Sequence, residues 1–274
     1  MNRFHQLFGG VRFAVIGMIH VAALPGTPMY AGSLEKIIAK ACKDAEIYAN
    51  SSVHGVLLEN MHDIPYLRHQ HLSPETVAVM TRVCSEVRKI IPNQIPCGVQ
   101  VLAGANQEAI ATAQASNLQF VRCEGFVFSH VADEGFIDGC AGQLLRYRRF
   151  INAEQIQIFT DIKKKHSSHA ITADVSVEET AHAAEFFLSD GLIITGVATG
   201  HAADEDQVKG VAAHTSLPVL IGSGINIQNL QKYLPYANGA IVGTHFKENG
   251  KWTMPVSKQR VDSFMEKLKT LEIS

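Results

Sequence analysis

The sequence has little of what marks membrane-spanning, disulfide-stabilised or nucleic-acid-binding proteins. No apolar run approaches the ~20 residues that a membrane-spanning helix needs. The five cysteines form no Cys-x-x-Cys pair and their number is odd, which is typical of reduced thiols inside a cell. The formal net charge is only −2, so no nucleic-acid-binding face is predicted. We therefore expect a soluble intracellular protein with no nucleic-acid partner.

Acidic residues are absent from the first 34 positions, and Arg3 and Arg12 lie within the first dozen. This composition is similar to that of a mitochondrial presequence. Residues 13–19 already read as a first strand, however, which leaves only residues 1–12 as an N-terminal extension. The expected compartment is the cytoplasm or, alternatively, the mitochondrial matrix.

What the chain does have is 46% hydrophobic residues, arranged as short apolar runs that alternate with helical patterns. The predicted strands are residues 13–19, 55–59, 97–102, 120–123, 156–161, 191–195, 218–225 and 239–245, the last two ending in turns. The predicted helices are residues 33–50, 73–91, 106–116, 143–151, 176–188, 204–214, 226–236 and 255–271. Ser33 suits an N-cap, and Pro74 suits the first position of its helix.

Eight alternating strands and helices require a parallel sheet, which closes most simply as a (β/α)₈ barrel, or TIM barrel, of the class α/β. An open doubly wound sheet is the alternative, although it would place a glycine-rich phosphate turn after its first strand. No linker divides the chain, so we expect one domain over residues 1–274. The long loop at residues 124–140 could be a lid over the site or a contact between the subunits of a homo-oligomer.

Two glycine-rich turns end the last two predicted strands. One is Gly222-Ser223-Gly224, and the other is Gly243-Thr244. Glycine lets the backbone approach a ligand closely, and the N–H groups at a following helix start attract anions. Consecutive turns of this kind late in a barrel predict a phosphate site of the ribulose-phosphate-binding type.

Polar residues follow most of the predicted strands, where a barrel has its active face. They are His20, Glu59, Asn60, Gln100, Arg122, Glu124, Asp161, Thr195, Ser223 and Thr244. Several carboxylates around one apolar rim predict either an acid–base pair with displaced pKa values or a divalent metal ion held by Glu59, Asp161 and Glu124. Alternatively, Glu59 and Asp161 cap loops or pair with neighbouring cations, and His20 belongs to the core.

Two loops add further candidates. In Asp161-Ile-Lys-Lys-Lys-His166, Lys163 and His166 could bind an anion and exchange a proton with it, whereas the alternative is a solvated basic loop. In the next loop, Thr195, Gly196 and Thr199 could extend a phosphate or sugar site. Asn60 and Arg122 complete the expected substrate-binding residues.

Two absences bear on cofactors and covalent chemistry. No lysine stands at the end of the sixth strand, which disfavours a lysine-dependent aldolase. The turn after the eighth strand lacks an arginine for a flavin phosphate and has Thr244-His245 instead. We expect neither a flavin nor a nicotinamide, and a divalent metal ion stays open.

The motifs at the strand ends resemble those of a known family. They are Gly17-Met-Ile-His20 with Leu24-Pro-Gly26, Glu59-Asn60-Met61 with Asp63-Ile-Pro65, Asp161-Ile-Lys163 with Lys165-His166, Ile194-Thr-Gly196 with Thr199-Gly200, Gly222-Ser-Gly224, and Val242-Gly-Thr244. Together they resemble the BtpA family, which includes the SgcQ-type proteins. The resemblance implies a phosphate-binding TIM barrel. It also implies either a role in photosystem I biogenesis at the membrane surface or one in sugar metabolism.

Two functions follow as hypotheses. The first is an enzyme that acts on a phosphorylated sugar or nucleotide-like ligand. Its catalytic residues would be Glu59, Asp161, His20 and His166, and its phosphate site would be Gly222, Ser223, Gly224, Gly243 and Thr244. Isomerase, lyase and hydrolase chemistry all fit these residue types. The second is a non-catalytic assembly or stability factor that keeps a ligand-binding barrel.

Overall fold

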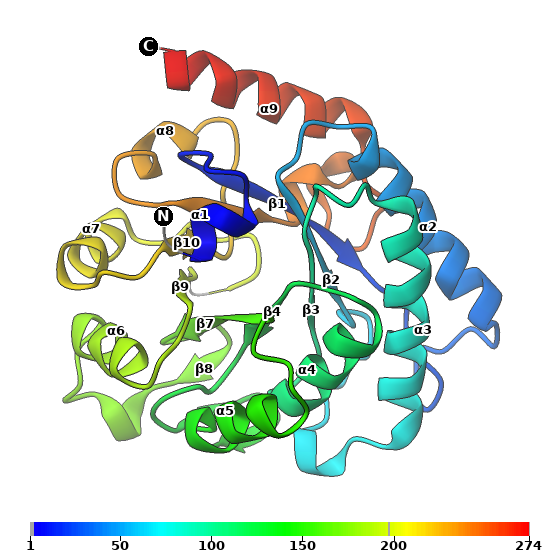
Figure 1. Ribbon diagram of the computed structural model, residues 1–274, viewed down its shortest axis with the longest axis horizontal. Coiled ribbons are helices and arrows are strands. Elements are labelled where there is room, and N and C mark those ends of the chain that lie inside the picture. The colour runs from blue at the N-terminus through cyan, green and yellow to red at the C-terminus, as the bar shows by residue number, and fades with distance from the viewer. Residues whose placement is uncertain (1–2, 197, 274) are drawn as a thin grey trace.

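Eight parallel strands close into a barrel surrounded by helices in the computed structural model of the chain, which describes residues 3–196 and 198–273 (Figure 1). Around the barrel the strands are β1 (Ala14–His20), β2 (Gly55–Glu59), β3 (Cys97–Gln100), β4 (Phe120–Cys123), β7 (Gln157–Ile162), β9 (Gly191–Ile194), β10 (Val219–Ile221) and β11 (Gly239–Val242), and β11 pairs with β1. The predicted TIM barrel is confirmed, and the open doubly wound sheet is excluded. Within the described residues, no helix is both long and apolar enough to cross a membrane.

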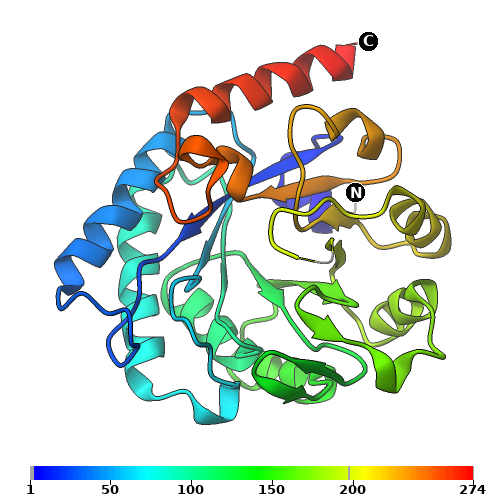
Figure 2. The same ribbon diagram turned by 180° about the vertical axis from the view of Figure 1, so that it is seen from behind.

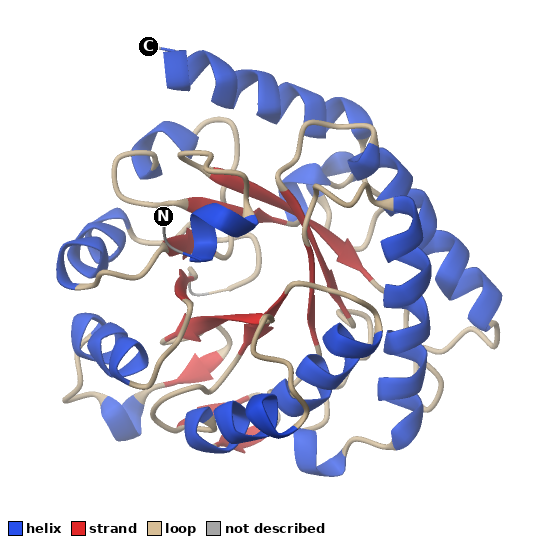
Figure 3. Ribbon diagram, in the orientation of Figure 1, coloured by secondary structure: helices blue, strands red, loops and turns tan. Residues whose placement is uncertain are grey.

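The helices form the outer layer and the strands the inner one (Figure 3). The outer helices are α2 (Leu34–Ala49), α3 (Pro74–Ile90), α4 (Asn106–Ala115), α5 (Ala141–Phe150), α6 (Val177–Phe186), α7 (Glu205–His214), α8 (Leu230–Tyr233) and α9 (Lys258–Ile273). Local signals set several of their starts. Ser33 caps α2 by accepting a hydrogen bond from the Lys36 N–H, and Pro74 opens α3, as predicted.

The predicted helix over residues 226–236 is wrong in length, since α8 has only four residues. The Asn226 side chain accepts hydrogen bonds from the backbone N–H groups of Gln228 and Asn229. The Asn229 Oδ1 in turn accepts a hydrogen bond from the Asn226 N–H. These turn bonds compete with a helix, so its start is delayed. No helix N-terminus therefore follows the Gly222–Gly224 turn directly.

The long loop after β4 is not unstructured. It contains an antiparallel hairpin, β5 (His130–Ala132) and β6 (Gly135–Ile137), and β5 pairs in turn with β8 (Ser167–Ser168). This small sheet fastens the loop after β4 to the loop after β7. The two loops are therefore held together on the face where the strands end (Figure 2).

The first residues form a plug in the barrel rather than a free extension. Helix α1 (Arg3–Leu7) lies within the ring of outer helices (Figure 1). Phe4 and Phe8 are buried against Phe120 and Phe159 of the strands, with ring centroids 5.8 Å apart for Phe4–Phe159 and for Phe8–Phe120. Arg3 adds an ion pair with Asp190 at 2.6 Å. Phe4 and Phe8 thus belong to the core of the barrel.

The core has two layers, inside the barrel and between strands and helices. The inner cluster contains Ile16, Leu57, Phe120, Phe159 and Ile241, together with the two plug phenylalanines. The outer cluster joins the opposite faces of the same strands to the helices. Because both faces are covered, the strands read as continuous apolar runs, which is the pattern that identified them in the sequence.

Candidate functional site

A central pocket opens at the carboxyl end of the barrel. It is lined by nine predicted site residues: His20, Glu59, Arg122, Thr199, Gly222, Ser223, Gly224, Gly243 and Thr244. Met18, Met61, Lys165, Gly200 and Ile241 complete its lining. These residues come from seven of the eight strands or their loops, so the pocket exists only in the closed barrel.

Glu59 is the carboxylate of this pocket. It ends β2 and is 8% exposed. Burial raises the pKa of Glu59, although the nearby Arg122 and Lys165 act in the opposite direction. Its register partner on β3 is Gln100, whose buried Oε1 has no hydrogen-bond partner among the described residues. A carboxyl group with a raised pKa in such surroundings is suited to giving and taking a proton.

Arg122 and Asp161 form a buried ion pair behind the pocket. Arg122 Nε donates to Asp161 Oδ2 at 2.9 Å, and Nη2 donates to Oδ1 at 2.8 Å. Both carboxylate oxygens of Asp161 are therefore engaged, which fits the ion-pair alternative from the sequence. Gly222 leaves room for this guanidinium, since a Cβ there would lie 3.3 Å from Arg122 Nη2 and 2.5 Å from Ile193 Cγ2. Arg122 is the member of the pair that lines the central pocket.

His20 faces the pocket with a defined tautomer. Its Nδ1 lies 3.0 Å from the carbonyl oxygen of Trp252, which can only accept, so Nδ1 carries the proton. A Cβ on Gly243 would lie 3.4 Å from His20 Nε2, so this second nitrogen points toward the glycine turn. Burial, with a contribution from Lys247, lowers the pKa of His20 well below its usual value. His20 is therefore held as a neutral imidazole, with its unprotonated nitrogen toward the pocket.

Lys165 lines the pocket although the sequence pointed to Lys163. Its Nζ donates to Thr199 Oγ1 at 3.2 Å, and its backbone N–H donates to Thr195 Oγ1 at 3.0 Å. Burial and the Arg122 guanidinium lower the pKa of this lysine. In an extended strand, Lys163 and Lys165 would share a face with Asp161. Lys163 has a φ of +45°, which breaks that alternation, so no sequence signal distinguished the two lysines.

An outer pocket of about 150 Å³ adjoins the central pocket. The two share Gly200, Gly224, Ile241, Gly243 and Thr244. Gly224 has a φ of +68°, and a Cβ there would lie 2.1 Å from the His201 backbone, so only glycine fits. Arg260, on α9, also lines this outer pocket, and its Nε donates to the His245 carbonyl at 2.6 Å. No sequence pattern indicated this cation, because Arg260 lies 15 residues beyond His245.

Ser223 and His166 join loops rather than present free side chains. Ser223 Oγ accepts from the Gly196 N–H at 2.8 Å and donates to the His201 carbonyl at 3.1 Å. His166 is exposed, and its Nε2 accepts from the Thr199 N–H at 3.3 Å. The structure therefore places Thr199 in the central pocket and keeps His166, Thr195 and Gly196 in the loops that support it.

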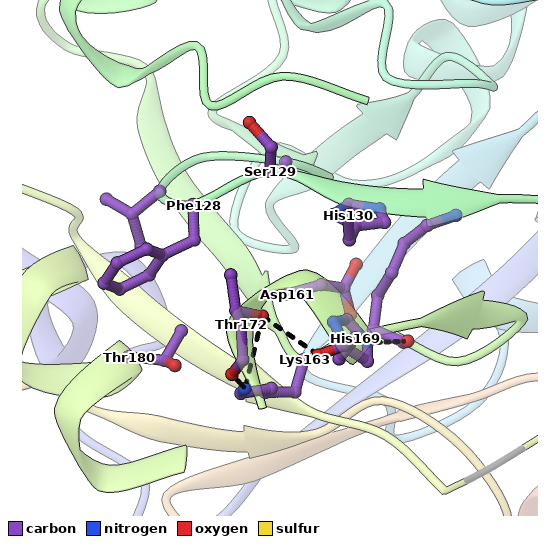
Figure 4. A pocket seen from close by; sticks show the side chains of 11 residues that line it. Phe128, Ser129, His130, Asp161, Lys163, His169, Thr172 and Thr180 are labelled. Carbon is purple, nitrogen blue, oxygen red and sulfur yellow. Dashed lines mark hydrogen bonds between the residues drawn. The ribbon is translucent and has the colours of Figure 1, made fainter. Parts of the chain in front are cut away.

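Lys163 points into a separate side pocket (Figure 4). Its Nζ donates to the Thr172 carbonyl at 2.8 Å, and the pocket is closed by the loop that carries Phe128 and His130. The expectation that Lys163 belongs to the substrate site is not met, because the side chain turns away from the central pocket. The short segment after β7 thus sends neighbouring lysines in different directions.

Asn60 ties together loops and does not line the central pocket. Its Nδ2 donates to Asp63 Oδ2 at 2.9 Å, and its Oδ1 accepts from the Leu102 N–H at 2.8 Å. Asp63 in turn accepts from the Leu24 N–H at 2.8 Å. Asn60 and Asp63 therefore fix the loops after β1, β2 and β3 relative to one another, which corrects the substrate-binding role predicted for Asn60.

The predicted metal site of three carboxylates does not form. Asp161 is paired with Arg122, and Glu124 accepts from Lys164 Nζ at 3.3 Å and from the Gly104 N–H at 3.1 Å. No group of three or more His, Cys, Asp or Glu side chains over residues 3–196 and 198–273 could hold a metal ion. The carboxylates at this rim are balanced by arginine and lysine instead, so we take the metal alternative no further.

Comparison with known proteins identifies relatives over nearly the whole chain. A family described as the BtpA family matches residues 12–270. An uncharacterized Caenorhabditis elegans protein, named as mitochondrial, is 47% identical over 97% of both chains. An uncharacterized Archaeoglobus fulgidus protein is 36% identical over 86% of this chain and 92% of its own. The photosystem I biogenesis protein BtpA of Synechocystis is 31% identical over 92% of this chain and 86% of its own.

Solved structures with the same architecture are only distantly related in sequence. Orotidine 5′-monophosphate decarboxylase from Methanocaldococcus jannaschii aligns with a TM-score of 0.60 and 12% identity over 94% of this chain and 99% of its own. Geranylgeranylglyceryl phosphate synthase from Thermoplasma acidophilum, with sn-glycerol-1-phosphate bound, aligns with a TM-score of 0.59. Its sequence is 13% identical, and the alignment covers 98% of this chain and 99% of its own. These similarities establish the fold.

Proposed function

The chain belongs to the BtpA family, and from this premise we propose that it is an enzyme acting on a phosphorylated sugar or nucleotide-like small molecule. The observation that carries the proposal is Glu59. It is a buried carboxyl group with a raised pKa that faces a pocket containing an imidazole, a guanidinium and an amine. Keeping such a group buried is unfavourable for stability, so a role in proton transfer accounts for it.

The outer pocket supports a phosphate ligand. It is lined by the two glycine turns, by Thr244 and by Arg260. The glycines let a phosphate come close to the backbone, Thr244 offers a hydroxyl group, and Arg260 offers a fixed positive charge. A phosphate held there would place the rest of the ligand in the central pocket, because the two pockets share five residues. Two of the distant structural neighbours are named for phosphate compounds, but the proposal rests on the residues of this chain.

The residues of the central pocket have separable roles in this proposal. Glu59 gives and takes the proton at the reacting carbon or oxygen, and the unprotonated Nε2 of His20 accepts a hydrogen bond from the ligand on the side of the glycine turn. Arg122, held by Asp161, stabilises negative charge that develops on the ligand. Isomerisation and bond cleavage both fit these roles.

The test is a thermal-shift series with inorganic phosphate and with pentose and hexose phosphates. A ligand at ~100 times its dissociation constant adds about 2.7 kcal/mol, which raises the melting temperature of a domain of this size by roughly 5–10 °C. Thr244→Val and Arg260→Met should abolish the shift. Lys163→Met is the matched control, since it removes a lysine of the side pocket and should leave the shift intact. A well-folded protein that none of these ligands stabilises would contradict the proposal.

A second candidate is a non-catalytic assembly or stability factor. The observation in its favour is that the Synechocystis relative is named as a photosystem I biogenesis protein. The two functions separate at Glu59→Gln. If the protein is an enzyme, this variant should lose turnover and still bind the ligand. If it is an assembly factor, the variant should restore the function of a host cell that lacks the protein as fully as the wild type does.

The compartment can be tested separately. The name of the Caenorhabditis elegans relative makes the mitochondrial matrix the first one to examine. Protease protection of the full-length chain in isolated mitochondria would support that location, and complete digestion without detergent would contradict it.

A further inference from the structure

Lys165 is the one amine that the structure brings to the proposed reaction centre among the described residues. We propose that Lys165 forms a covalent Schiff base with the carbonyl carbon of a phosphorylated aldose or ketose in the central pocket. This inference rests on the proposed function, because the outer pocket must hold the phosphate. It adds a covalent step and restricts the ligand to one that carries an aldehyde or ketone group.

The three consecutive lysines after β7 have different surroundings. Lys163 Nζ donates to the Thr172 carbonyl in the side pocket, and Lys164 Nζ pairs with Glu124 at 3.3 Å. Lys165 Nζ donates to the hydroxyl of Thr199 at 3.2 Å, and it takes part in no salt bridge within the described part of the chain. Its partner is therefore a neutral group, which does not hold the amine in its charged form as a carboxylate would.

The charge around Lys165 favours a free amine. The side chain is half-buried, and Arg122 is the cation that lowers its pKa most. Glu59, Asp161 and Glu124 act in the opposite direction, yet the pKa of Lys165 still falls below its usual value. Asp161 is neutralised by the bidentate pair with Arg122, and Glu124 by Lys164, which limits their pull on Lys165. An amine becomes a nucleophile in this way, by desolvation next to another cation.

The neighbouring acid completes the step. The lone pair of Lys165 Nζ attacks the carbonyl carbon, and proton transfer from nitrogen to oxygen gives a carbinolamine. Glu59 in its protonated form then gives its proton to the hydroxyl group, the C–O bond breaks, and water leaves. One C=N bond has formed, one water is released, and Glu59 is left ionised beside a positively charged imine. No oxidant or reductant is required.

The sequence disfavoured lysine chemistry because no lysine was expected at the end of the sixth strand. In the structure this strand is β9, and no lysine ends it. The amine reaches the pocket from the loop of the preceding barrel strand, β7, and is held by Thr199 of the loop after β9. The positive φ angles of Lys163 and His166, +45° and +53°, shape the intervening loop so that Lys165 turns inward. A tertiary contact across 34 residues thus supplies the amine at a position that the strand pattern did not indicate.

The experiment traps the imine in the wild-type protein. Glyceraldehyde 3-phosphate and dihydroxyacetone phosphate are each incubated with the protein and cyanoborohydride at neutral pH, and the modified lysine is located by fragmentation mass spectrometry. We expect Lys165 to carry at least tenfold more adduct than Lys163 or Lys164, and inorganic phosphate to suppress it. Lys165→Met should lose the adduct, and Lys163→Met, the matched control, should keep it.

The outcomes separate this inference from the proposed function. Phosphate that stabilises the protein, combined with no adduct or with equal labelling of the three lysines, overturns the Schiff base and leaves the phosphate-binding proposal intact. If no phosphate compound stabilises the protein, the proposed function fails and the inference fails with it. The comparison of three lysines within one chain remains decisive even if Lys165→Met does not fold.

Discussion

Arg122 donates two hydrogen bonds to the two carboxylate oxygens of Asp161, at 2.9 Å from Nε and 2.8 Å from Nη2. The pair spans adjacent strands β4 and β7 and is almost fully buried, with side-chain exposures of 6% for Arg122 and 0% for Asp161. Asp161 therefore fixes the plane of the guanidinium that lines the central pocket. A bidentate pair of this kind supplies direction as well as charge.

Breaking this pair should be strongly destabilising. We expect Asp161→Asn or Arg122→Met alone to lower the free energy of unfolding by about 3–5 kcal/mol, because each leaves a buried group without its partner. The double variant Arg122→Met with Asp161→Leu should cost less than the sum of the two single changes. Urea denaturation of all variants measures this. Asp262→Asn, which removes an exposed i, i+4 pair with Lys258, is the control and should change stability by about 0.5 kcal/mol at most.

Glu59→Gln should make the protein more stable and less active. Burial raises the pKa of Glu59, so the folded state binds this proton more tightly than the unfolded state. The ionised carboxylate is then unfavourable at neutral pH, and replacing it should add about 0.5–2 kcal/mol, as is common for residues kept for function. The gain should shrink as pH falls toward 4, where Glu59 is protonated. A variant less stable than the wild type at pH 7 would contradict the raised pKa of this carboxyl group.

The N-terminal plug should be essential for stability. Phe4→Ala and Phe8→Ala should each cost about 3–5 kcal/mol, because each ring fills the barrel interior beside Phe159 or Phe120. Phe150, which is 82% exposed at the end of α5, is the matched control. Phe150→Ala should change the free energy of unfolding by about 0.5 kcal/mol or less. Equal effects at positions 4, 8 and 150 would show that the plug does not form in solution.

Acid should destabilise the protein through three histidines. Burial, assisted by a nearby lysine or arginine, lowers the pKa values of His62, His130 and His245 to about 4. Unfolded histidines take up protons near pH 6.5, so the unfolded state gains protons first as pH falls from 7 to 4 and stability is lost over that range.

Since His62 and His245 are only half-buried, we expect about 1 kcal/mol for each of them, and a larger effect for His130, which is buried. Stability measured between pH 7 and pH 4 should fall less steeply in His62→Gln, His130→Gln and His245→Gln. His182→Gln, at an exposed position, serves as the control. A steeper fall in the three variants would mean that these imidazoles are charged in the folded state.

The site was only partly predictable from the sequence. His20, Glu59, Arg122 and the glycine turns were correctly placed at the carboxyl end of the barrel, because a residue at the end of a parallel strand must lie at that rim. Lys165 and Arg260 were missed. The position of Lys165 depends on the backbone of a loop with positive φ angles, and that of Arg260 depends on the packing of the last helix. Neither signal is local in the sequence.

The sequence by itself determined the architecture of this protein. Short continuous apolar runs and period-3.6 patterns are local, and eight strands buried on both faces have one simple way to close. Only the tertiary structure decided the chemistry of the rim. Whether Asp161 and Glu124 hold a metal or a cation, and which of three lysines enters the pocket, depends on contacts between residues 34–40 positions apart. Those contacts set burial and charge, and burial and charge shift the pKa values of Glu59, His20 and Lys165.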